Sequence, residues 1–399
     1  MMLRMKLATG AIGAMGWVIT GISFKLSSRE VIRHAWRSTL YNDQPLGLRV
    51  NKSLYWNSYT SDFNPCRQFA MKPLTFSVLR LLSDGEFHSG VVIARNLGVS
   101  RASVSLALRG LDEVGLVVHK VHGRGYRLSG PMQWLEREVI LQHLGTEAET
   151  FRLEILDTVE STNSLLLQKT AMGMDSDSGG VRVVATELQT SGRGRRGREW
   201  HSGVGDSLTF SLLWRFQQGA NLLSGLSLVV GVAIVRVLQS FEIRGTVLKW
   251  PNDVLFHYRK LAGILIELQG DMLGPTTAVI GIGMNLKLSD CIKARIDQDA
   301  TDLFAITGEM PDRNKLLAAL LVELVAVLRK FERQGFAPFR EEWVRYHGFE
   351  NKSITLHLPD GSSQEGVVHG IGEDGSLRLQ TAAGNCDYNG GEITLRRVT

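Results

Sequence analysis

The sequence predicts an α+β protein in which a small helical head precedes a larger domain built on a mixed β-sheet. The chain has 399 residues, enough for two or three domains. Its hydrophobic content of 44% and charged content of 21% are ordinary for a globular protein. Helical periodicity dominates the residues that follow Met71, whereas strand patterns separated by helices follow from Phe151.

Residues 71–130 are predicted to fold as a winged helix-turn-helix, a DNA-binding module. Three apolar stretches show helical spacing, at residues 74–82, 91–97 and 104–111. Ser100 lies where it would cap the third helix, and the short glycine-containing turn before it is typical of helix-turn-helix proteins. Two short strands about a His-Gly-Arg-Gly turn then form the pattern of a wing.

Charge favours DNA as the partner of this head. The segment carries eight Lys/Arg against four Asp/Glu, an excess that the alternative, a three-helix protein-interaction module, does not need. The residues expected to contact DNA are Ser100, Arg101, Ser103, Ser105, Lys120 and Arg124. Two features of the third helix count against DNA binding. Leu106 is expected on its outward face, and Gly110 lowers helix propensity by about 1 kcal/mol relative to alanine.

The first 70 residues fall outside this pattern. Residues 7–24 carry no charge and follow Arg4 and Lys6, which makes them a candidate membrane anchor or signal peptide. The segments after them show no clear periodicity. We expect residues 1–70 to be a poorly ordered extension, created by an upstream start codon, because Met71 begins a plausible independent domain and a DNA-binding head cannot work outside the cell.

Charge and cysteine content limit the classes of function for the rest of the chain. Nine of the Lys/Arg but only three of the Asp/Glu lie in residues 1–70, so the net charge of +5 does not argue for nucleic-acid binding elsewhere. The three cysteines, Cys66, Cys291 and Cys386, are far apart and form no CxxC pair. Neither a structural zinc site nor a disulfide framework is expected, and a reducing cytosol fits.

The most specific motif is Gly192-Arg-Gly-Arg-Arg-Gly-Arg-Glu-Trp200. Its glycines let the backbone fold tightly and offer amides to an anion, and its arginine forks suit carboxylate and phosphate. The indole of Trp200 offers a flat surface to a planar base. The alternative is an RG-type RNA-binding segment, but the run is short, unrepeated and flanked by strand patterns. No Walker GxxxxGK[ST] sequence occurs in the chain.

Four further motifs place polar residues beside predicted strands. They are Glu160-Ser-Thr-Asn163, Val247-Leu-Lys-Trp-Pro-Asn-Asp-Val254, Lys260-Leu-Ala-Gly-Ile-Leu-Ile-Glu267 and Ala278-Val-Ile-Gly-Ile-Gly-Met-Asn285. In the first motif, Ser or Thr has a simpler interpretation as the cap of the helix that follows. Pro251 cannot continue a central ladder, so Asn252 and Asp253 are expected at a strand end, where active-site loops are found. Lys260, just before an apolar strand, would place one positive charge on a cleft floor.

Together these motifs indicate the joining of a carboxylate to a nucleotide phosphate. The arginine loop and Lys260 attract anions, and Asp253 is a candidate partner for a metal or phosphate. The sequence shows no Ser/His/Asp array, no metal-ligand cluster and no reactive-cysteine setting. The indicated reaction depends on neutralising and aligning two anions rather than on a protein nucleophile.

These motifs, in this order, closely resemble those of the bifunctional biotin–protein ligases, the BirA family. The resemblance implies a winged helix-turn-helix at residues 71–130, a mixed-sheet catalytic domain of the biotin/lipoate ligase type at 131–347, and a small β-barrel at 348–399. It implies that biotin and MgATP form biotinyl-5′-AMP. Biotin then passes to a lysine of the biotin carboxyl carrier protein of acetyl-CoA carboxylase.

The resemblance also assigns residues to roles. Those implied to hold biotin are Ser161, Thr162, Asn163, Gln189, Gly192, Arg193, Arg195, Lys260, Gly263 and Leu265. Those implied to hold ATP are Arg195, Arg198, Trp200, Lys249, Asn252, Asp253 and Asn285. Arg195, Lys260 and Asp253 are implied to be catalytic. A bidentate arginine and a point-charge lysine can flank one phosphorus while its in-line face stays open.

Regulation is implied as well. Biotinyl-5′-AMP would act as corepressor, order the arginine-rich loop and promote a homodimer whose two heads bind a biotin-synthesis operator. The protein would be cytoplasmic, with no membrane partner. One departure from the family pattern is the aromatic residue expected directly before the terminal Gly-Gly pair, which is displaced to Tyr388.

Two other functions stay open. A lipoate–protein ligase shares the catalytic fold and the reaction type, although the spacing of the arginine-rich loop favours biotin. A regulator that binds biotinyl adenylate without transferring biotin belongs to another class, but every implied catalytic position carries the expected residue type.

Overall fold

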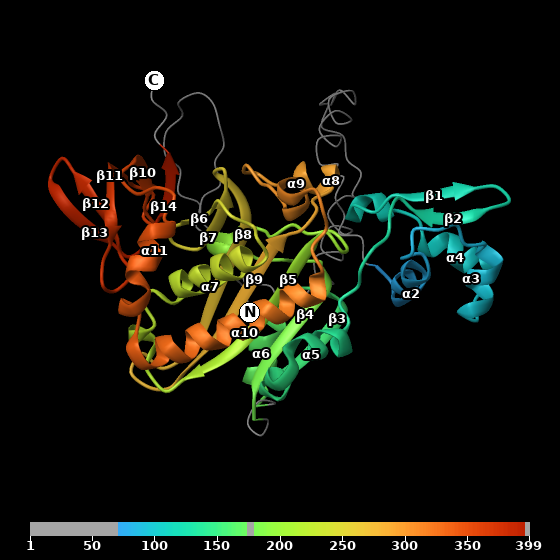
Figure 1. Cartoon of the computed structure of the whole chain (residues 1–399), viewed down its shortest axis with the longest axis horizontal. Coiled ribbons are helices and arrows are strands. Elements are labelled where there is room, and N and C mark those ends of the chain that lie inside the picture. Colours follow the sequence, from blue (N-terminus) through green and yellow to red (C-terminus); the bar gives the residue numbers. More distant parts are fainter. Residues whose placement is uncertain (1–70, 174–178, 396–399) are drawn as a thin grey trace, which may run out of the picture. The chain divides into compact units, whose positions relative to one another are not determined.

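A computed structural model describes residues 71–173 and 179–395 of the chain (Figure 1). The predicted extension at residues 1–70, with its uncharged run, lies outside the described residues. Within the described ranges, no helix is both long and apolar enough to cross a membrane.

The head contains three short helices and a hairpin, as predicted. Its elements are α2 (Pro73–Leu81), α3 (Gly90–Asn96), α4 (Arg101–Ala107), the 3-10 helix η2 (Leu111–Val114), β1 (Val118–Val121) and β2 (Gly125–Leu128). Ser100 caps α4, because its hydroxyl accepts a hydrogen bond from the Ser103 amide at 3.0 Å. Phe76, Leu79 and Val104 are fully buried and form the centre of its core.

The third helix is shorter than the sequence predicts. It ends at Ala107, and Leu108 is its C-cap, although the partly buried Leu108 side chain still packs against the core of the head. Gly110 has a φ of 71°, in the left-handed region, so it lies outside the helix and the expected propensity penalty does not arise. Leu106 is 56% exposed, which confirms its position on the outward face.

The larger domain is built on a seven-stranded mixed sheet, which confirms the predicted α+β class. The strand order is β3-β4-β5-β9-β8-β7-β6, in which β3 and β4 run parallel and the other pairs antiparallel. The strands are β3 (Phe151–Val159), β4 (Val181–Gln189), β5 (Ser207–Phe216), β6 (Thr246–Lys249), β7 (Asp253–Phe256), β8 (Arg259–Gly270) and β9 (Thr276–Asn285). Asn252 therefore lies in the turn after the end of β6, and Asp253 begins β7, which agrees with the predicted place of both residues at a strand end.

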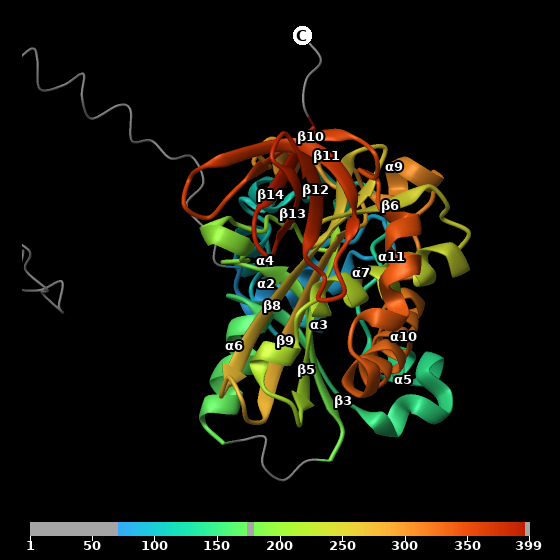
Figure 2. The ribbon, with the colours of Figure 1, turned by 90° about the vertical axis from the view of Figure 1, so that its left-hand side faces the viewer.

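Helices cover both faces of this sheet, so its central strands are apolar on both sides. Figure 2 shows the sheet between α6 on one side and α7 with α10 on the other. The helices of the domain are α5 (Arg137–Leu144), α6 (Thr162–Ala171), α7 (Leu226–Ser240), α8 (Asp290–Lys293), α9 (Leu303–Thr307) and α10 (Arg313–Gln334). Val183 packs in the core on the side of α7 and α10, whereas its neighbour Val184 packs against Leu166 of α6. Residues 223–241 and 312–334 carry apolar side chains at helical spacing, and these ranges contain α7 and α10.

The C-terminal strands form an open sheet rather than the predicted barrel, and their buried side chains belong to the same core as those of the larger sheet. Helix α11 (Arg340–Tyr346) leads into five antiparallel strands in the order β13-β12-β11-β10-β14. These strands are β10 (Ser353–His357), β11 (Ser363–Ile371), β12 (Leu377–Thr381), β13 (Gly384–Tyr388) and β14 (Glu392–Leu395). A closed barrel requires the two edge strands to pair. In the described part of the chain, β13 pairs with β12 and β14 pairs with β10, so both edges stay open.

A buried carboxyl next to β5 makes stability depend on pH. The Asp206 carboxylate accepts hydrogen bonds from the Gly203 amide at 2.7 Å and the Ser207 hydroxyl at 2.9 Å. Burial nevertheless raises the pKa of Asp206 to about 6. The folded chain therefore keeps this proton to a higher pH than the unfolded chain, and the free energy of unfolding falls between about pH 4 and pH 6.

We expect Asp206→Asn to remove this dependence. Relative to the variant, the wild type should lose about 3 kcal/mol between pH 4 and pH 7. Urea unfolding of both proteins at the two pH values measures the difference. The same change in stability for both proteins would contradict the assignment to Asp206.

Candidate active site

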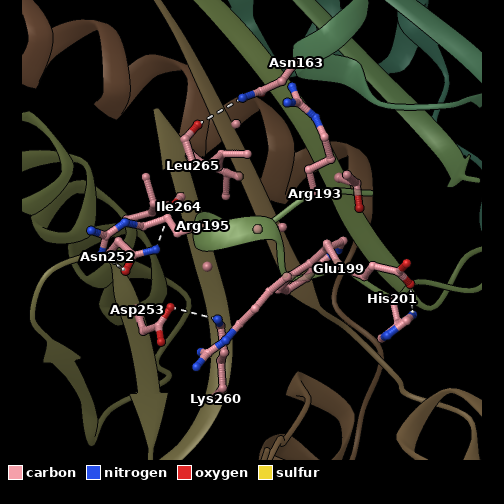
Figure 3. A pocket seen from close by; sticks show the side chains of 18 of the residues that line it. Asn163, Arg193, Arg195, Glu199, His201, Asn252, Asp253, Lys260, Ile264 and Leu265 are labelled. Carbon is pink, nitrogen blue, oxygen red and sulfur yellow. Dashed lines mark hydrogen bonds and ion pairs between the residues drawn. The ribbon is translucent and has the colours of Figure 1, made fainter. Parts of the chain in front are cut away.

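All but two of the predicted ligand-binding residues of the larger domain line one cavity of about 280 Å³ (Figure 3). They are Ser161, Thr162, Asn163, Gln189, Arg193, Arg195, Arg198, Trp200, Lys249, Asn252, Asp253, Lys260, Gly263 and Leu265. The structure thus brings together motifs that are far apart in the sequence.

The two exceptions, Gly192 and Asn285, lie next to the cavity. A Cβ atom on Gly192 would lie 2.4 Å from the carbonyl oxygen of Trp200, so only glycine fits there. The Asn285 side-chain nitrogen donates to the carbonyl oxygens of Lys260 at 3.3 Å and Thr301 at 3.0 Å. Its Oδ1 is buried and has no hydrogen-bond partner among the described residues. The role of Asn285 in bonding a base edge stays a prediction.

The arginine-rich loop, residues 192–200, is a tight hairpin closed by its own backbone. The Trp200 amide donates to the Gly192 carbonyl at 2.9 Å, and the Gly194 amide donates to the Arg198 carbonyl at 2.7 Å. Arg196 reverses the chain at a φ of 56°. This local pairing favours a structured anion-binding loop over the alternative of an unstructured RNA-binding segment.

Trp200 rests on glycines of β8 and β9. A Cβ atom on Gly283 would lie 2.3 Å from the indole ring, and one on Gly263 would lie 3.3 Å from it. The indole lines the cavity, and its Nε1 is buried without an acceptor among the described residues. The sheet thus supports the ring, and Lys260 Nζ lies over it, 6.0 Å from its centroid.

Arg195 reaches the cavity through a contact with the turn before β7. Its Nη1 donates to the Asn252 side-chain oxygen at 3.2 Å, and the Asn252 nitrogen donates to the Ile264 carbonyl at 2.8 Å. Asn252 is thereby fixed between the loop and β8. Burial, followed by the charge of Arg196, lowers the pKa of Arg195 below its usual value. The guanidinium still carries its charge at neutral pH.

Lys260 and Asp253 form a partly buried ion pair on the cavity wall. The Nζ to Oδ1 distance is 2.9 Å, and the side chains are 16% and 14% exposed (Figure 3). The strand register places Asp253 opposite Lys249 of β6. Burial lowers the pKa of Lys249; Asp253 opposes this shift and Lys260 adds to it. An anion in the cavity would stabilise both ammonium groups.

The cavity wall carries a net positive charge, with six Lys or Arg side chains and four Asp or Glu side chains. Such a site attracts a polyanion. The Arg198 guanidinium is engaged by Glu392 of β14 at 2.5 Å. Within the described residues, no group of three His, Cys, Asp or Glu is placed to hold a metal ion.

The other end of the cavity holds a chain of buried hydrogen bonds. The Thr162 amide donates to the Gln189 side-chain oxygen at 2.8 Å, and the Thr162 and Ser211 hydroxyls lie 2.6 Å apart. The Ser211 hydroxyl also donates to Asn163 Oδ1 at 2.6 Å. Ser161 caps α6, which confirms the simpler interpretation of that hydroxyl.

Sequence patterns do not single out several residues at or near the cavity. They are His201, Ser211, Arg295, Asp297, Gln298 and Glu392. The signal that could have indicated Ser211 is a hydroxyl within the apolar run of β5. Glu392 contacts Arg198 across 194 positions of sequence, and no local pattern marks it.

The residues predicted to contact DNA lie on α4 and on the hairpin. Arg101, Lys120 and Arg124 are exposed, whereas Ser103 and Ser105 are partly buried. The Ser100 hydroxyl caps α4 and also lies 2.8 Å from the Ser103 hydroxyl. Arg124 also lies over the Phe87 ring, 4.2 Å from its centroid, and Lys120 lies 5.8 Å from the centroid of the Tyr126 ring. The Ser100 and Ser103 hydroxyls are engaged at the helix start.

Comparisons with known proteins agree with this geometry. The biotin/lipoate A/B protein ligase family matches residues 156–285. The chain is 36% identical to "Bifunctional ligase/repressor BirA" of Escherichia coli (strain K12), over 80% of this chain and 96% of that protein. It is 32% identical to a biotin–[acetyl-CoA-carboxylase] ligase of Mycobacterium tuberculosis, over 67% of this chain and 97% of that protein. A solved biotin protein ligase from Aquifex aeolicus, in complex with biotin and ATP, is 30% identical with a TM-score of 0.52 and covers 62% of this chain and 99% of that chain.

Proposed function

The chain belongs to the biotin/lipoate A/B protein ligase family, in its bifunctional BirA branch, and we propose that it is an ATP-dependent biotin–protein ligase that also represses transcription. Biotin and ATP would form biotinyl-5′-AMP and pyrophosphate, and biotin would pass to a lysine of a biotin carboxyl carrier protein. The observation that carries this proposal is the single cavity in which Arg195, Lys260 and Trp200 lie together with the buried polar chain at Thr162.

The charges of the cavity fit both half-reactions. In the first, a biotin carboxylate oxygen attacks the α-phosphorus and the bond to pyrophosphate breaks. Arg195 and Lys260 offset the repulsion between these two anions and hold them in line. In the second, the neutral amine of the acceptor lysine attacks the acyl carbon, AMP leaves, and the amine loses a proton. Lys260 would stabilise the negative charge at the phosphate in both steps.

Asp253 fits a role beside the magnesium of MgATP. Nucleotide sites hold Mg²⁺ through one or two carboxylates together with phosphate oxygens and water. The ion pair with Lys260 engages Oδ1 of Asp253. The second carboxylate oxygen is the ligand that this residue would offer. Magnesium bound there would neutralise part of the charge of the triphosphate.

Gly281 and Gly283 of β9 would lie beside different ligands, biotin and ATP respectively. Because Trp200 would stack on adenine, Gly283→Ala should raise the KM for ATP about tenfold, since a Cβ atom would lie 2.3 Å from the indole. Because Asn163 belongs to the biotin side, Gly281→Ala should raise the KM for biotin by a similar factor, since its Cβ would lie 2.2 Å from Asn163 Oδ1. Steady-state kinetics with each substrate varied in turn measures both effects. Equal changes in both KM values for either variant would contradict this division.

The head is proposed to be a winged helix-turn-helix that binds a biotin-synthesis operator. Its support is the exposed Arg101 of α4 together with Lys120 and Arg124 of the hairpin. Biotinyl-5′-AMP would act as corepressor by favouring a homodimer, because ligand binding and dimer assembly would stabilise the same state. Gel-shift and sedimentation measurements with and without biotin and ATP test both parts.

The first test of the proposal is direct biotinylation. The full chain is incubated with biotin, MgATP and a biotin carboxyl carrier domain, and the carrier is weighed by mass spectrometry. We expect one added biotinyl group. Addition from lipoate but not biotin would identify a lipoate ligase, and adenylate without transfer would identify a sensor.

A further inference from the structure

Glu267 of β8 joins two parts of the site from outside the cavity wall. Its Oε2 accepts hydrogen bonds from Arg193 Nη2 at 2.6 Å and from Asn163 Nδ2 at 2.9 Å. Arg193 belongs to the arginine-rich loop, whereas Asn163 is in the first turn of α6, and Figure 3 shows the two side chains next to each other. The Glu267 side chain is 24% exposed. The charge attraction for ATP and biotin does not explain a carboxylate at this position.

The carboxylate fixes the orientation of the Asn163 amide. Asn163 Nδ2 also donates to the Leu265 carbonyl at 3.2 Å (Figure 3). Both partners of this nitrogen can only accept hydrogen bonds, so exchanging the nitrogen and oxygen of the amide would lose both contacts. Asn163 Oδ1 must therefore accept, and its donor is the Ser211 hydroxyl at 2.6 Å.

The same order of donor and acceptor then determines the hydrogen bond between Ser211 and Thr162 at the cavity wall. The proton of Ser211 is used on Asn163, so its oxygen accepts from the Thr162 hydroxyl at 2.6 Å. Gln189 Oε1 accepts from the Thr162 amide at 2.8 Å and is a second acceptor for the Thr162 hydroxyl, at 3.1 Å. Thr162, which lines the cavity, is thus left with a lone pair and no proton to offer a ligand. A ligand group that contacts this hydroxyl has to be a donor.

We propose that Glu267 is a positioning residue for biotin recognition, because it sets the direction of the hydrogen bonds through Asn163 and Ser211, which act together with Gln189 so that Thr162 accepts from the ligand. This inference rests on the proposed biotin ligase function. The cyclic urea of biotin offers two N–H donors, whereas the dithiolane ring of lipoate offers none. Glu267 and Ser211 are absent from the described cavity wall and act through the residues that form it. The contact with Arg193 ties the arginine-rich loop to the same carboxylate.

The test compares biotin with a cyclic carbonate analogue in which oxygen replaces both N–H groups. Pyrophosphate release by the full chain gives kcat and the KM for each compound. In Glu267→Gln, whose amide can donate, the KM for biotin should rise about tenfold. The KM for ATP should stay within about twofold of wild type. The preference for biotin over the carbonate should fall by about the same factor of ten. Glu267→Asp remains an acceptor and should keep most of that preference.

Three further variants separate this role from a general loss of structure. Ser211→Ala interrupts the same chain, so it should lower the preference for biotin, and the double variant with Glu267→Gln should lower it no further. Glu138→Gln removes an exposed ion pair with Arg137 on α5 and should change nothing.

An unchanged preference in Glu267→Gln and Ser211→Ala, or losses that add in the double variant, would overturn this inference while leaving the ligase function intact. If Glu267→Gln does not fold, Ser211→Ala and Glu267→Asp give the same comparison. A wild-type chain that does not use biotin would overturn the proposed function itself.

Discussion

Lys260→Ala should slow formation of biotinyl-5′-AMP about 10²- to 10³-fold, while the affinity for biotin changes little. The ammonium lies in the cavity wall, 16% exposed, where a fixed charge stabilises a developing phosphate charge more than it would in water. The buried polar chain that would hold the ring of biotin starts at Thr162 and does not include Lys260. Single-turnover release of pyrophosphate measures the rate, and calorimetry measures biotin binding.

This substitution also leaves Asp253 without its ion-pair partner, and an unpaired carboxylate would repel ATP. The double variant Lys260→Ala/Asp253→Asn removes both charges and separates the two effects. If Lys260 acts on the phosphate, the double variant is no faster than Lys260→Ala, and Asp253→Asn alone measures the loss that the proposed magnesium ligand accounts for. Recovery of the wild-type rate would show that the unpaired Asp253 caused the loss, and normal pyrophosphate release by Lys260→Ala would refute the role of Lys260.

The sequence predicted those parts of the fold that local patterns decide. Ser100 and Ser161 cap helices as expected, and Asp312 caps α10 by accepting from the Asn314 and Lys315 amides at 2.9 and 3.0 Å. The pairing of strands that are far apart in the chain could not be predicted from local patterns. The C-terminal strands resemble a barrel in sequence, but whether β13 reaches β14 depends on the twist and stagger of five strands, which no single segment encodes.

The same distinction holds for the site. Motifs with unusual composition, such as the arginine-rich loop, indicated the residues that would touch the ligands. Residues that position other side chains do not lie in motifs of unusual composition. Glu267 was read only as the last residue of an apolar strand, because its partners Arg193 and Asn163 lie 74 and 104 positions away. Glu392 was missed for the same reason.

Arg195→Gly should release the biotinyl adenylate about 10²-fold faster than wild type. The Arg195 guanidinium lies in the cavity wall and is held there by Asn252 at 3.2 Å. Loss of the Arg195 side chain removes a charged, bidentate hydrogen-bond donor from the phosphate of the intermediate. Free biotinyl-5′-AMP acylates exposed amines, so lysines of unrelated proteins should become biotinylated. A mixture of the carrier domain and serum albumin, analysed by mass spectrometry, measures this spread.

Arg196→Gly is the matched control for this experiment. Arg196 carries the same side chain one position further along the loop, is exposed, and does not belong to the described cavity wall. Its φ of 56° suits glycine, so the variant adds backbone freedom to the same loop without removing a charge from the cavity. We expect Arg196→Gly to label only the carrier. Equal labelling of albumin by both variants would mean that loop flexibility, and not the Arg195 guanidinium, retains the intermediate; labelling of the carrier alone by Arg195→Gly would refute the retaining role of Arg195.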